Sequence, residues 1–285
     1  MSRERRDARA TGGPAVADAA GSALVERWLE GRHAVITGGS RGLGAAIADA
    51  LAARGADVTV LGRDGAALEQ VSAQLRRHGV AALALTCDVT DPARVQAAFA
   101  EASAAHGDPY VLVNNAGQAD GAPFLETTRA LWDRMLAVNL TAAYLCTQQV
   151  LGAMLERRAG RIVNVASTSG LRGYRNISAY TAAKHGLVGL TRALAAEVAG
   201  KGVTVNAICP GFAATDIVWN GARTIAARTG RGFDDAVAAM ARQNPGGRLV
   251  EPAEVAEAVL RLVADDTING ESVVLDGTAP LRRNP

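Results

Sequence analysis

The chain has 285 residues and is poor in several features that mark whole classes of protein. Its three cysteines, Cys87, Cys146 and Cys209, are far apart in apolar runs, which excludes a disulfide framework or a cysteine metal cluster and predicts buried free thiols. No apolar stretch is long enough to span a bilayer, so no transmembrane helix is expected. The net charge is only +2 and the arginines are scattered among acids, so neither nucleic acid nor an anionic membrane is an expected partner.

Lysine is scarce as well, because the 30 basic residues include only two lysines, Lys184 and Lys201. A lysine kept against this bias indicates a role that arginine cannot fill. Tyr180 stands four residues before Lys184 in a run that reads as helix, so the two side chains share a face. A fixed positive charge favours the phenolate, which predicts a pKa of Tyr180 below its ordinary value of about 10. The pair therefore indicates a proton-transfer site beside a bound ligand.

A glycine-rich turn near the N-terminus indicates what that ligand is. The strand-like run His33–Thr37 leads into Gly38–Gly44, and an alanine-rich helix follows over residues 45–54. Strand, glycine-rich turn and helix in this order are typical of dinucleotide binding. The glycines let the backbone approach a pyrophosphate, and the helix start supplies free N–H groups. Taken alone the turn could also be purely structural, but the downstream tyrosine and lysine favour a cofactor.

Strand-like and helix-like segments alternate through the rest of the chain, which predicts an α/β fold with a parallel sheet covered on both faces. The expected strands are residues 33–37, 57–61, 80–86, 110–113, 161–165, 203–208 and 271–275. A helix starting at Asp91-Pro92 is expected to have an acidic cap, and one long helix is expected over residues 128–158. Further helices are expected up to residue 77, over 178–200 and from 252 onward.

Residues 1–30 differ in composition from the remainder. In residues 1–10 four arginines stand beside two acids, and a stretch of Gly, Ala and Pro follows, which predicts a disordered, solvated tail. The acids argue against a transit peptide, and a partner-binding arm is the alternative. Trp28 and Leu29 are expected to pack onto the domain edge. Residues 31–285 are expected to form one domain of a cytoplasmic enzyme.

Six motifs together resemble the short-chain dehydrogenase/reductase superfamily, and the 3-ketoacyl-thioester reductases in particular. The resemblance covers residues 31 to about 277 and implies a single Rossmann-type domain with a seven-stranded, doubly wound parallel sheet. It also implies hydride transfer between a nicotinamide dinucleotide and a carbonyl or alcohol, in a homodimer or homotetramer. The motifs are Thr37–Gly44, Asn114–Gly117, Asn139, Ser167 with Tyr180, Lys184, and Pro210-Gly211.

The same resemblance implies four catalytic roles. Tyr180 is the expected general acid, because reducing a ketone leaves negative charge on an oxygen that needs a proton. Ser167 is expected to orient that oxygen, although Thr168 and Ser169 are nearby competitors. Lys184 would hold the nicotinamide ribose hydroxyls. Asn139 would support a water-linked proton relay, with a purely structural buried asparagine as the alternative.

Cofactor contacts are implied after five of the expected strands. For Asp88 the alternative is a cap before the following helix, and Asn114 has the alternative role of stabilising the sheet. The implied positions, besides Tyr180 and Lys184, are Gly38, Ser40, Arg41, Gly42, Leu43, Gly44, Arg63, Asp88, Val89, Asn115, Ala116, Gly117, Pro210, Gly211, Ala213 and Thr215.

Charge decides which dinucleotide is expected. NAD-preferring relatives carry an acid at the end of the second strand, where this chain has Gly62 followed by Arg63. With Arg41 in the glycine-rich turn, two guanidiniums suit the 2′-phosphate of NADP. Asp64 leaves NAD as an alternative, because a shifted register would place its carboxylate near the ribose.

The substrate is less well defined by the sequence. The loop 212–247 is expected to cover the pocket and residues 170–177 to form its opposite wall, with Ser169, Arg172 and Tyr174 lining it. Arg172 and Arg175 could bind the phosphates of a coenzyme A or carrier-protein thioester, or they could be solvated loop residues. A ketone-reducing direction is predicted. The alternatives are an NAD-dependent secondary-alcohol dehydrogenase of a degradative pathway and a non-catalytic cofactor-binding regulator.

Overall fold

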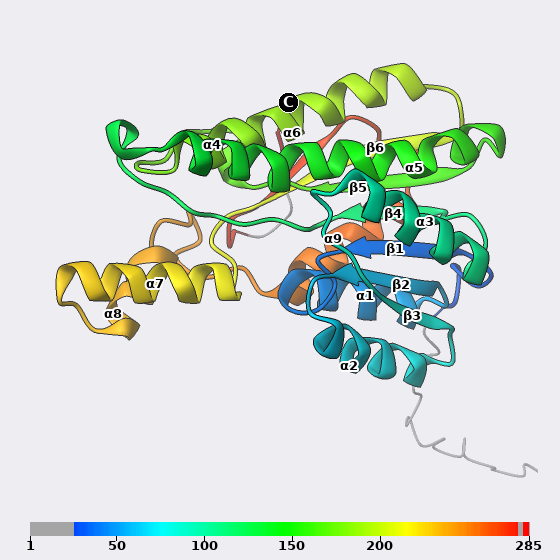
Figure 1. Ribbon diagram of the computed structural model, residues 1–285, viewed down its shortest axis with the longest axis horizontal. Helices are drawn as coiled ribbons and strands as arrows, with labels where there is room; N and C mark the ends of the chain where they lie inside the picture. Colours follow the sequence, from blue (N-terminus) through cyan, green and yellow to red (C-terminus); the bar gives the residue numbers. More distant parts are fainter. Residues whose placement is uncertain (1–25, 279–281, 285) are drawn as a thin grey trace, which may run out of the picture.

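The computed structural model describes residues 26–278 and 282–284, and its core is one sheet with the strand order β3-β2-β1-β4-β5-β6-β7-β8 (Figure 1). The first seven strands are parallel, as predicted. β8 adds an antiparallel strand that the sequence did not predict, because its three residues are too few to show a pattern. The strands are β1 His33–Thr37, β2 Asp57–Gly62, β3 Ala82–Thr86, β4 Val111–Asn114, β5 Gly160–Val165, β6 Val203–Pro210, β7 Ser272–Leu275 and β8 Arg282–Asn284.

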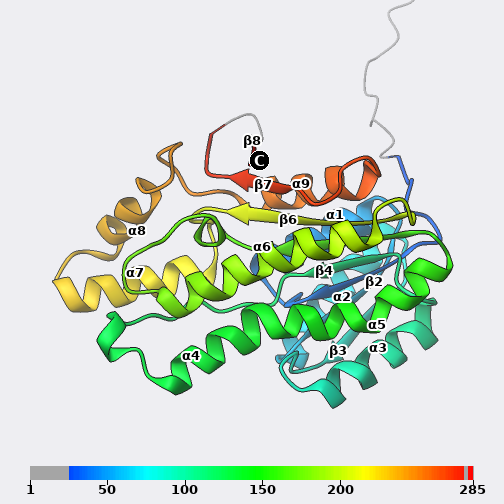
Figure 2. The same ribbon diagram turned by 90° about the horizontal axis from the view of Figure 1, so that it is seen from above.

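Helices cover both faces of the sheet, which confirms the doubly wound α/β arrangement (Figures 1 and 2). Alternate residues of β1 face opposite layers: Ala34 and Ile36 pack against α1, α2 and α9, whereas Val35 packs against α3, α5 and α6. The helices are α1 Gly42–Ala53, α2 Gly65–Leu75, α3 Pro92–His106, α4 Arg129–Leu136, α5 Ala142–Glu156, α6 Ser178–Val198, α7 Asp216–Thr229, α8 Phe233–Ala241 and α9 Pro252–Ala264.

The order of the strands changes direction at β1, and this switch point positions the site. β1 pairs with β2 on one side and with β4 on the other. The chain that leaves β1 therefore continues into a helix on one face of the sheet, whereas the chain that leaves β4 leads to helices on the other face. Ligands of open α/β sheets bind at such a switch point.

The helix that begins at Pro92 starts as predicted. The Asp91 carboxylate accepts hydrogen bonds from Ala93 N at 3.0 Å and Arg94 N at 3.2 Å. Proline stands in the first turn, where its missing N–H costs no hydrogen bond. This cap fixes where α3 leaves the C-terminal edge of the sheet.

The long helix expected over residues 128–158 is confirmed in extent but is not α-helical throughout. A π-helical segment, Ala137–Thr141, lies between α4 and α5. Single π turns inserted in helices are often found at functional sites. This one carries Asn139.

Leu29 packs onto the domain edge, as expected from the sequence. Leu29 is 1% exposed within the core, and its N–H donates to Arg54 O at 2.9 Å. Trp28 remains 36% exposed. The expectation of disorder for residues 1–25 concerns positions outside the described residues. Leu29 is held because its side chain extends the apolar layer of α1 and α9.

Two helices of the expected substrate loop project beyond the C-terminal edge of the sheet (Figures 1 and 2). α7 and α8 pack on each other through Val218, Ala222, Ala236 and Met240. Within residues 26–278, no helix combines the length and the hydropathy that crossing a bilayer requires.

Candidate active site

Three of the four residues with predicted catalytic roles meet at the end of β5. Tyr180 and Lys184 lie one turn apart on α6, with the Lys184 Nζ 5.7 Å from the centre of the Tyr180 ring. Ser167, two residues after β5, forms a hydrogen bond with the Tyr180 side chain. Tyr180 is 9% exposed and Lys184 is 4% exposed. The structure therefore brings a phenol, a hydroxyl and an ammonium together in a nearly water-free place.

Lys184 is a buried cation with donors to spare. Its Nζ donates to Val165 O at 2.8 Å, which is its one hydrogen bond within the described part of the chain. Burial lowers the pKa of Lys184 to about 8, because the charged form loses hydration. An ammonium carries three donors, so two remain for a ligand that can solvate the charge. Ribose hydroxyls are acceptors of the right kind.

The pKa of Tyr180 is shifted in the direction opposite to the prediction. Burial raises it to about 12, and the hydrogen bond from Ser167, which lowers the pKa, offsets only part of this effect. The predicted lowering is wrong because desolvation of the buried phenolate dominates, and Lys184 is not among the groups that shift the pKa of Tyr180. In this structure Tyr180 is a protonated phenol at neutral pH.

Asn139 reaches the same site from the π-helical segment. Its Nδ2 donates to Met135 O at 3.0 Å and Gln118 O at 2.9 Å, and its Oδ1 accepts from Gln118 N at 3.2 Å. A methyl group at Gly117 would lie 2.8 Å from Asn139 Oδ1 and 3.6 Å from Lys184 Nζ. Glycine at this position therefore keeps the two polar groups on either side of one narrow space.

The glycine-rich turn is tied to the loop after β4 by reciprocal hydrogen bonds. Asn115 Nδ2 donates to Thr37 O at 2.9 Å and Gly38 O at 3.0 Å. Thr37 Oγ1 in turn accepts from the backbone N–H groups of Asn115 and Ala116, each at 3.0 Å. The Asn115 amide is thus occupied by the backbone of the turn. Thr37, to which the sequence assigned no role of its own, fixes the width of the crevice.

The N-terminus of α1 has the properties expected of a pyrophosphate site. Arg41, the residue before the helix, makes no capping hydrogen bond with its side chain, so the first N–H groups stay available. Gly42 has a φ of 55°, which favours glycine. Across the crevice, a methyl group at Gly42 would lie 3.5 Å from the Thr215 methyl carbon. The segment after Pro210 therefore faces the turn, and the donor set fits a dinucleotide.

A cavity of about 360 Å³ lies where the adenosine end is expected, and it has a second arginine that the sequence analysis missed. Asp88 accepts hydrogen bonds from Thr90 N and Oγ1, which lower the pKa of its carboxyl, as do Arg63 and Arg94. Val89 has its side chain in the core, so only its backbone can face a ligand. The cavity is lined by Arg63, Thr86, Asp88, Asp91 and Arg94.

Two residues near this cavity have partners that the sequence did not predict. Arg41 Nε lies 3.2 Å from Asp216 Oδ2, so Arg41 is directed toward α7 and does not line the cavity with Arg63. Asp64 accepts a hydrogen bond from Ala67 N at 3.1 Å and caps α2. The Asp64 carboxylate, which the NAD alternative places near the ribose, is therefore engaged at the start of α2.

Tyr174 connects the two walls of the expected substrate pocket. Its hydroxyl is 2.9 Å from Thr168 Oγ1 and accepts a hydrogen bond from Arg172 Nε at 2.8 Å. Its ring meets the edge of Phe212 with 6.2 Å between ring centres. Ser169 is 5% exposed, and its N–H donates to Ser167 Oγ at 3.0 Å. Arg172 is thus held beside Tyr174, whereas Arg175 is exposed.

The three thiols are free and buried, as predicted. Cys209 lies against the site, where the backbone of Ser167 forms a hydrogen bond with its sulfur. Burial raises the pKa of Cys209 to about 11, so this thiol stays protonated at neutral pH. It acts as an apolar neighbour of Tyr180 and Lys184.

Comparison with known proteins agrees with this geometry. The sequence model of the short-chain dehydrogenase family matches residues 32–225. A ketoacyl reductase of the granaticin polyketide synthase from Streptomyces violaceoruber is 41% identical over 82% of this chain and 86% of its own length. The 3-oxoacyl-[acyl-carrier-protein] reductase FabG of Escherichia coli is 36% identical over 87% of this chain and 97% of its own. A variant of actinorhodin polyketide ketoreductase, solved with NADPH, superposes with a TM-score of 0.83 at 37% identity, over 86% of this chain and 96% of its own.

Proposed function

Because the chain belongs to the short-chain dehydrogenase/reductase family and is an oxidoreductase acting on CH–OH groups, we propose that it reduces ketones with NADPH. The observation that carries the proposal is the cluster of Ser167 with the buried Tyr180 and Lys184 at the C-terminal edge of the sheet. These side chains can donate a proton, orient an oxygen and hold a ribose, which are the tasks that ketone reduction requires.

Tyr180 is the proposed proton donor. A nicotinamide held at this site would supply a hydride for the carbonyl carbon, and the carbonyl oxygen would then need a proton. The Tyr180 hydroxyl delivers its proton to that oxygen while the Ser167 hydroxyl donates a hydrogen bond to it. A pKa raised to about 12 keeps Tyr180 protonated at neutral pH, so the proton to be donated is present.

Lys184 and Asn139 are proposed to complete the proton path. The two N–H groups that Lys184 does not spend on Val165 O would bond the nicotinamide ribose hydroxyls. The Asn139 Oδ1 lies beside Gly117, as does the Lys184 Nζ, and there it can hold a water that passes a proton toward Tyr180. Both groups act by position, and neither forms a bond to the substrate.

The preference for NADP is proposed from the adenosine cavity. Arg63 and Arg94 flank it, and the end of β2 carries Gly62 where NAD-preferring relatives have an acid. Two guanidiniums suit a phosphate with its three oxygens. Arg41 can join them only by leaving Asp216. The similar polyketide ketoreductase, which was solved with NADPH, supports the choice.

A 3-ketoacyl thioester or a polyketide-like ketone is the proposed substrate. Arg172 lies at the rim, fixed by its bond to Tyr174, where it can meet a phosphate of coenzyme A or a carrier protein. Tyr174 and Phe212 give the pocket an aromatic wall. The names of the relatives, a ketoacyl reductase and a 3-oxoacyl-carrier-protein reductase, support this class.

Association of identical subunits is also proposed. Phe124 and Leu125, just before α4, are 73% and 98% exposed, and Tyr144 on α5 is 47% exposed. Exposed apolar side chains on neighbouring elements are typical of a protein contact. A homodimer or homotetramer would cover them.

The test of this function is the loss of NADPH and NADH absorbance against a panel of ketones. The panel holds acetoacetyl-CoA, a small diketone, a quinone and a cyclic ketone. We expect turnover of the thioester with NADPH, and Arg63→Ala should lower kcat/KM for NADPH at least about tenfold with little change for NADH. Arg77→Ala, an exposed arginine after α2, is the control. Turnover with NADH alone, or an unchanged cofactor ratio in Arg63→Ala, would contradict the NADP assignment.

A further inference from the structure

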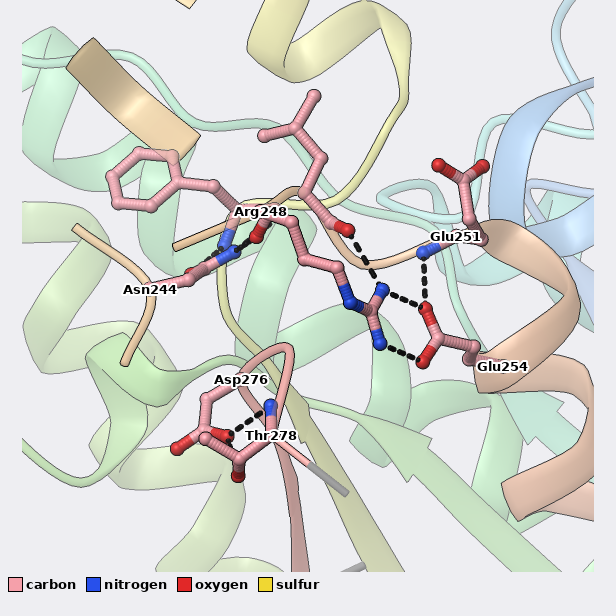
Figure 3. Close-up of polar contacts among 8 residues, drawn as sticks. Asn244, Arg248, Glu251, Glu254, Asp276 and Thr278 are labelled. Atoms are coloured by element: carbon pink, nitrogen blue, oxygen red, sulfur yellow. Dashed lines mark hydrogen bonds and ion pairs between the residues drawn. The ribbon is translucent and has the colours of Figure 1, made fainter. Parts of the chain in front are cut away.

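Asn244 joins both ends of the loop that carries α7 and α8. Its Nδ2 donates to Phe212 O at 2.9 Å and to Arg248 O at 2.6 Å, and its Oδ1 accepts from Phe212 N at 2.9 Å (Figure 3). The residue is only 3% exposed. A primary amide has two donors and an accepting oxygen, so these bonds use all the donors that Asn244 has. One side chain therefore holds the backbone of Phe212 from both sides.

The bond to Asn244 also explains the glycine before Phe212. A methyl group on Gly211 would collide with Asn244 Oδ1, so position 211 has no room for a side chain while the amide is in place. The sequence analysis assigned Gly211 to cofactor binding only. The structure gives it a second reason, which is contact with Asn244.

The far side of Asn244 is firmly anchored. Arg248 forms two bonds of 2.6 Å with the Glu254 carboxylate, which also accepts from Glu251 N at 2.8 Å (Figure 3). The pKa of Glu254 is lowered to about 2, chiefly by its hydrogen bonds to Arg248. Gly246 N donates to Asp276 O at 3.1 Å, just after β7. The segment that carries Asn244 is thus bonded both to α9 and to the end of β7.

The segment that Asn244 holds, Gly211-Phe212, lies between the two proposed ligand sites. The Phe212 ring meets the edge of Tyr174, the aromatic wall of the substrate pocket. Pro210-Gly211, on its other side, is the segment proposed to meet the nicotinamide, and Gly211 N is fixed to Leu275 O at 2.7 Å. A shift of Phe212 would therefore change the distance between the ketone and the hydride donor.

We propose that Asn244 is a positioning residue of this site, which fixes the backbone of Gly211-Phe212 and so sets the wall between the nicotinamide and the ketone. The proposal rests on the proposed function for the identity of the two ligands. It assigns a role to a residue outside every motif in the sequence. Its test needs one measurement that does not depend on turnover and one that does.

The first measurement is amide hydrogen exchange at Phe212. In the wild-type protein this N–H is bonded to Asn244 Oδ1, so we expect slow exchange, and Asn244→Ala should exchange much faster at this amide. Asn244→Asp keeps an accepting oxygen and should retain part of the protection. Equal exchange at Phe212 in the wild type and Asn244→Ala would overturn the proposal, whether or not any ketone is turned over.

The second measurement is steady-state kinetics with NADPH and a ketone that the wild type reduces. Asn244→Ala and Asn244→Asp should raise the ketone KM or lower kcat by about tenfold to hundredfold, because misplacement near the reacting atoms is costly. NADPH affinity should stay within about twofold, since most of its contacts lie on the other side of the crevice.

Asn269→Ala is the matched control for loss of stability. Asn269 also makes two bonds to backbone groups, to Val205 N and Ala195 O at 2.9 Å each, but at the opposite edge of the sheet. A melting temperature lowered equally in Asn244→Ala and Asn269→Ala, with ketone kinetics unchanged in both, would show a merely structural role and overturn the proposal. A wild-type protein that reduces no ketone would instead refute the proposed function, and exchange at Phe212 would still decide whether Asn244 holds this segment.

Discussion

The residues of the proposed site are costly to the folded protein, and Lys184 shows this most clearly. A lysine that is 4% exposed, with one hydrogen bond in the described residues and no carboxylate among the charges that shift its pKa, stabilises the fold less than an apolar side chain would. The pKa of Lys184, lowered from 10.5 to about 8, measures this cost. The residue is explained by its function and not by its packing.

We therefore expect Lys184→Met to stabilise the protein and abolish turnover. At pH 7 the buried charge of Lys184 costs roughly 3 kcal/mol of stability. The free energy of unfolding of the variant, measured by urea denaturation, should therefore exceed that of the wild type by about 1–3 kcal/mol. Because the unfolded chain binds more protons than the folded one between pH 8 and 10.5, wild-type stability should rise over that range and the difference should shrink. A variant less stable than the wild type at pH 7 would contradict this account.

The sequence was sufficient to identify the residues that meet at the site but not their energetics. The spacing of Tyr180 and Lys184 and the position of Ser167 after a strand follow from local periodicity, and the structure places all three together. The direction of the Tyr180 pKa shift was wrong because it depends on burial by distant segments. Arg94 and Asn244 were missed for the same reason, since their partners come from other parts of the chain.

At the scale of elements, the buried end of β1 carries a histidine that links three parts of the fold. His33 Nδ1 is 2.7 Å from Gly107 O after α3, and Nε2 is 2.9 Å from Thr59 Oγ1 on β2. The His106 ring stands edge-on at 5.3 Å between ring centres. Burial lowers the pKa of His33 to about 4, and the neighbouring His106 adds to the effect. This end of the sheet therefore requires a neutral imidazole.

This histidine should make the protein sensitive to acid. Below pH 6.5 the unfolded chain binds a proton that folded His33 refuses until about pH 4, so stability should fall over that range by up to roughly 3 kcal/mol. When the free energy of unfolding is measured in urea between pH 7 and pH 4.5, it should fall less steeply with decreasing pH in His33→Gln than in the wild type. His185→Gln, an exposed histidine on α6, should keep the wild-type slope. If the free energy of unfolding depended on pH equally in the wild type and in His33→Gln, the acid sensitivity could not be assigned to His33.

Elements were predicted best where their pattern is local. The seven parallel strands and the cap of α3 agree with the expectations, because apolar runs and the Asp91-Pro92 pair define them within a few residues. The π-helical turn at Ala137–Thr141 was not foreseen, since its residues read as ordinary helix. β8 was also missed, because it depends on contact with an edge strand formed by distant residues.

At the scale of the whole molecule, the fold gathers the proposed functional groups at one edge of the sheet. The glycine-rich turn follows β1, the Asn114–Gly117 loop follows β4, Ser167 follows β5 and Pro210-Gly211 ends β6. Asn115 and Asn244 connect neighbouring loops by bonds to their backbones. The opposite edge carries His33 and Arg161, whose buried contacts stabilise the fold. Chemistry and stability are thus placed at opposite ends of the strands.

The central claim is that Tyr180 donates the proton in an NADPH-dependent ketone reduction. The most direct test compares wild type and Tyr180→Phe, measuring NADPH binding by fluorescence titration and ketone reduction by loss of NADPH absorbance. We expect NADPH affinity within about twofold of the wild type and a rate lowered by about 10³-fold, because the ring remains and only the acidic proton is removed. Ketone reduction by Tyr180→Phe at a rate near that of the wild type would contradict the account.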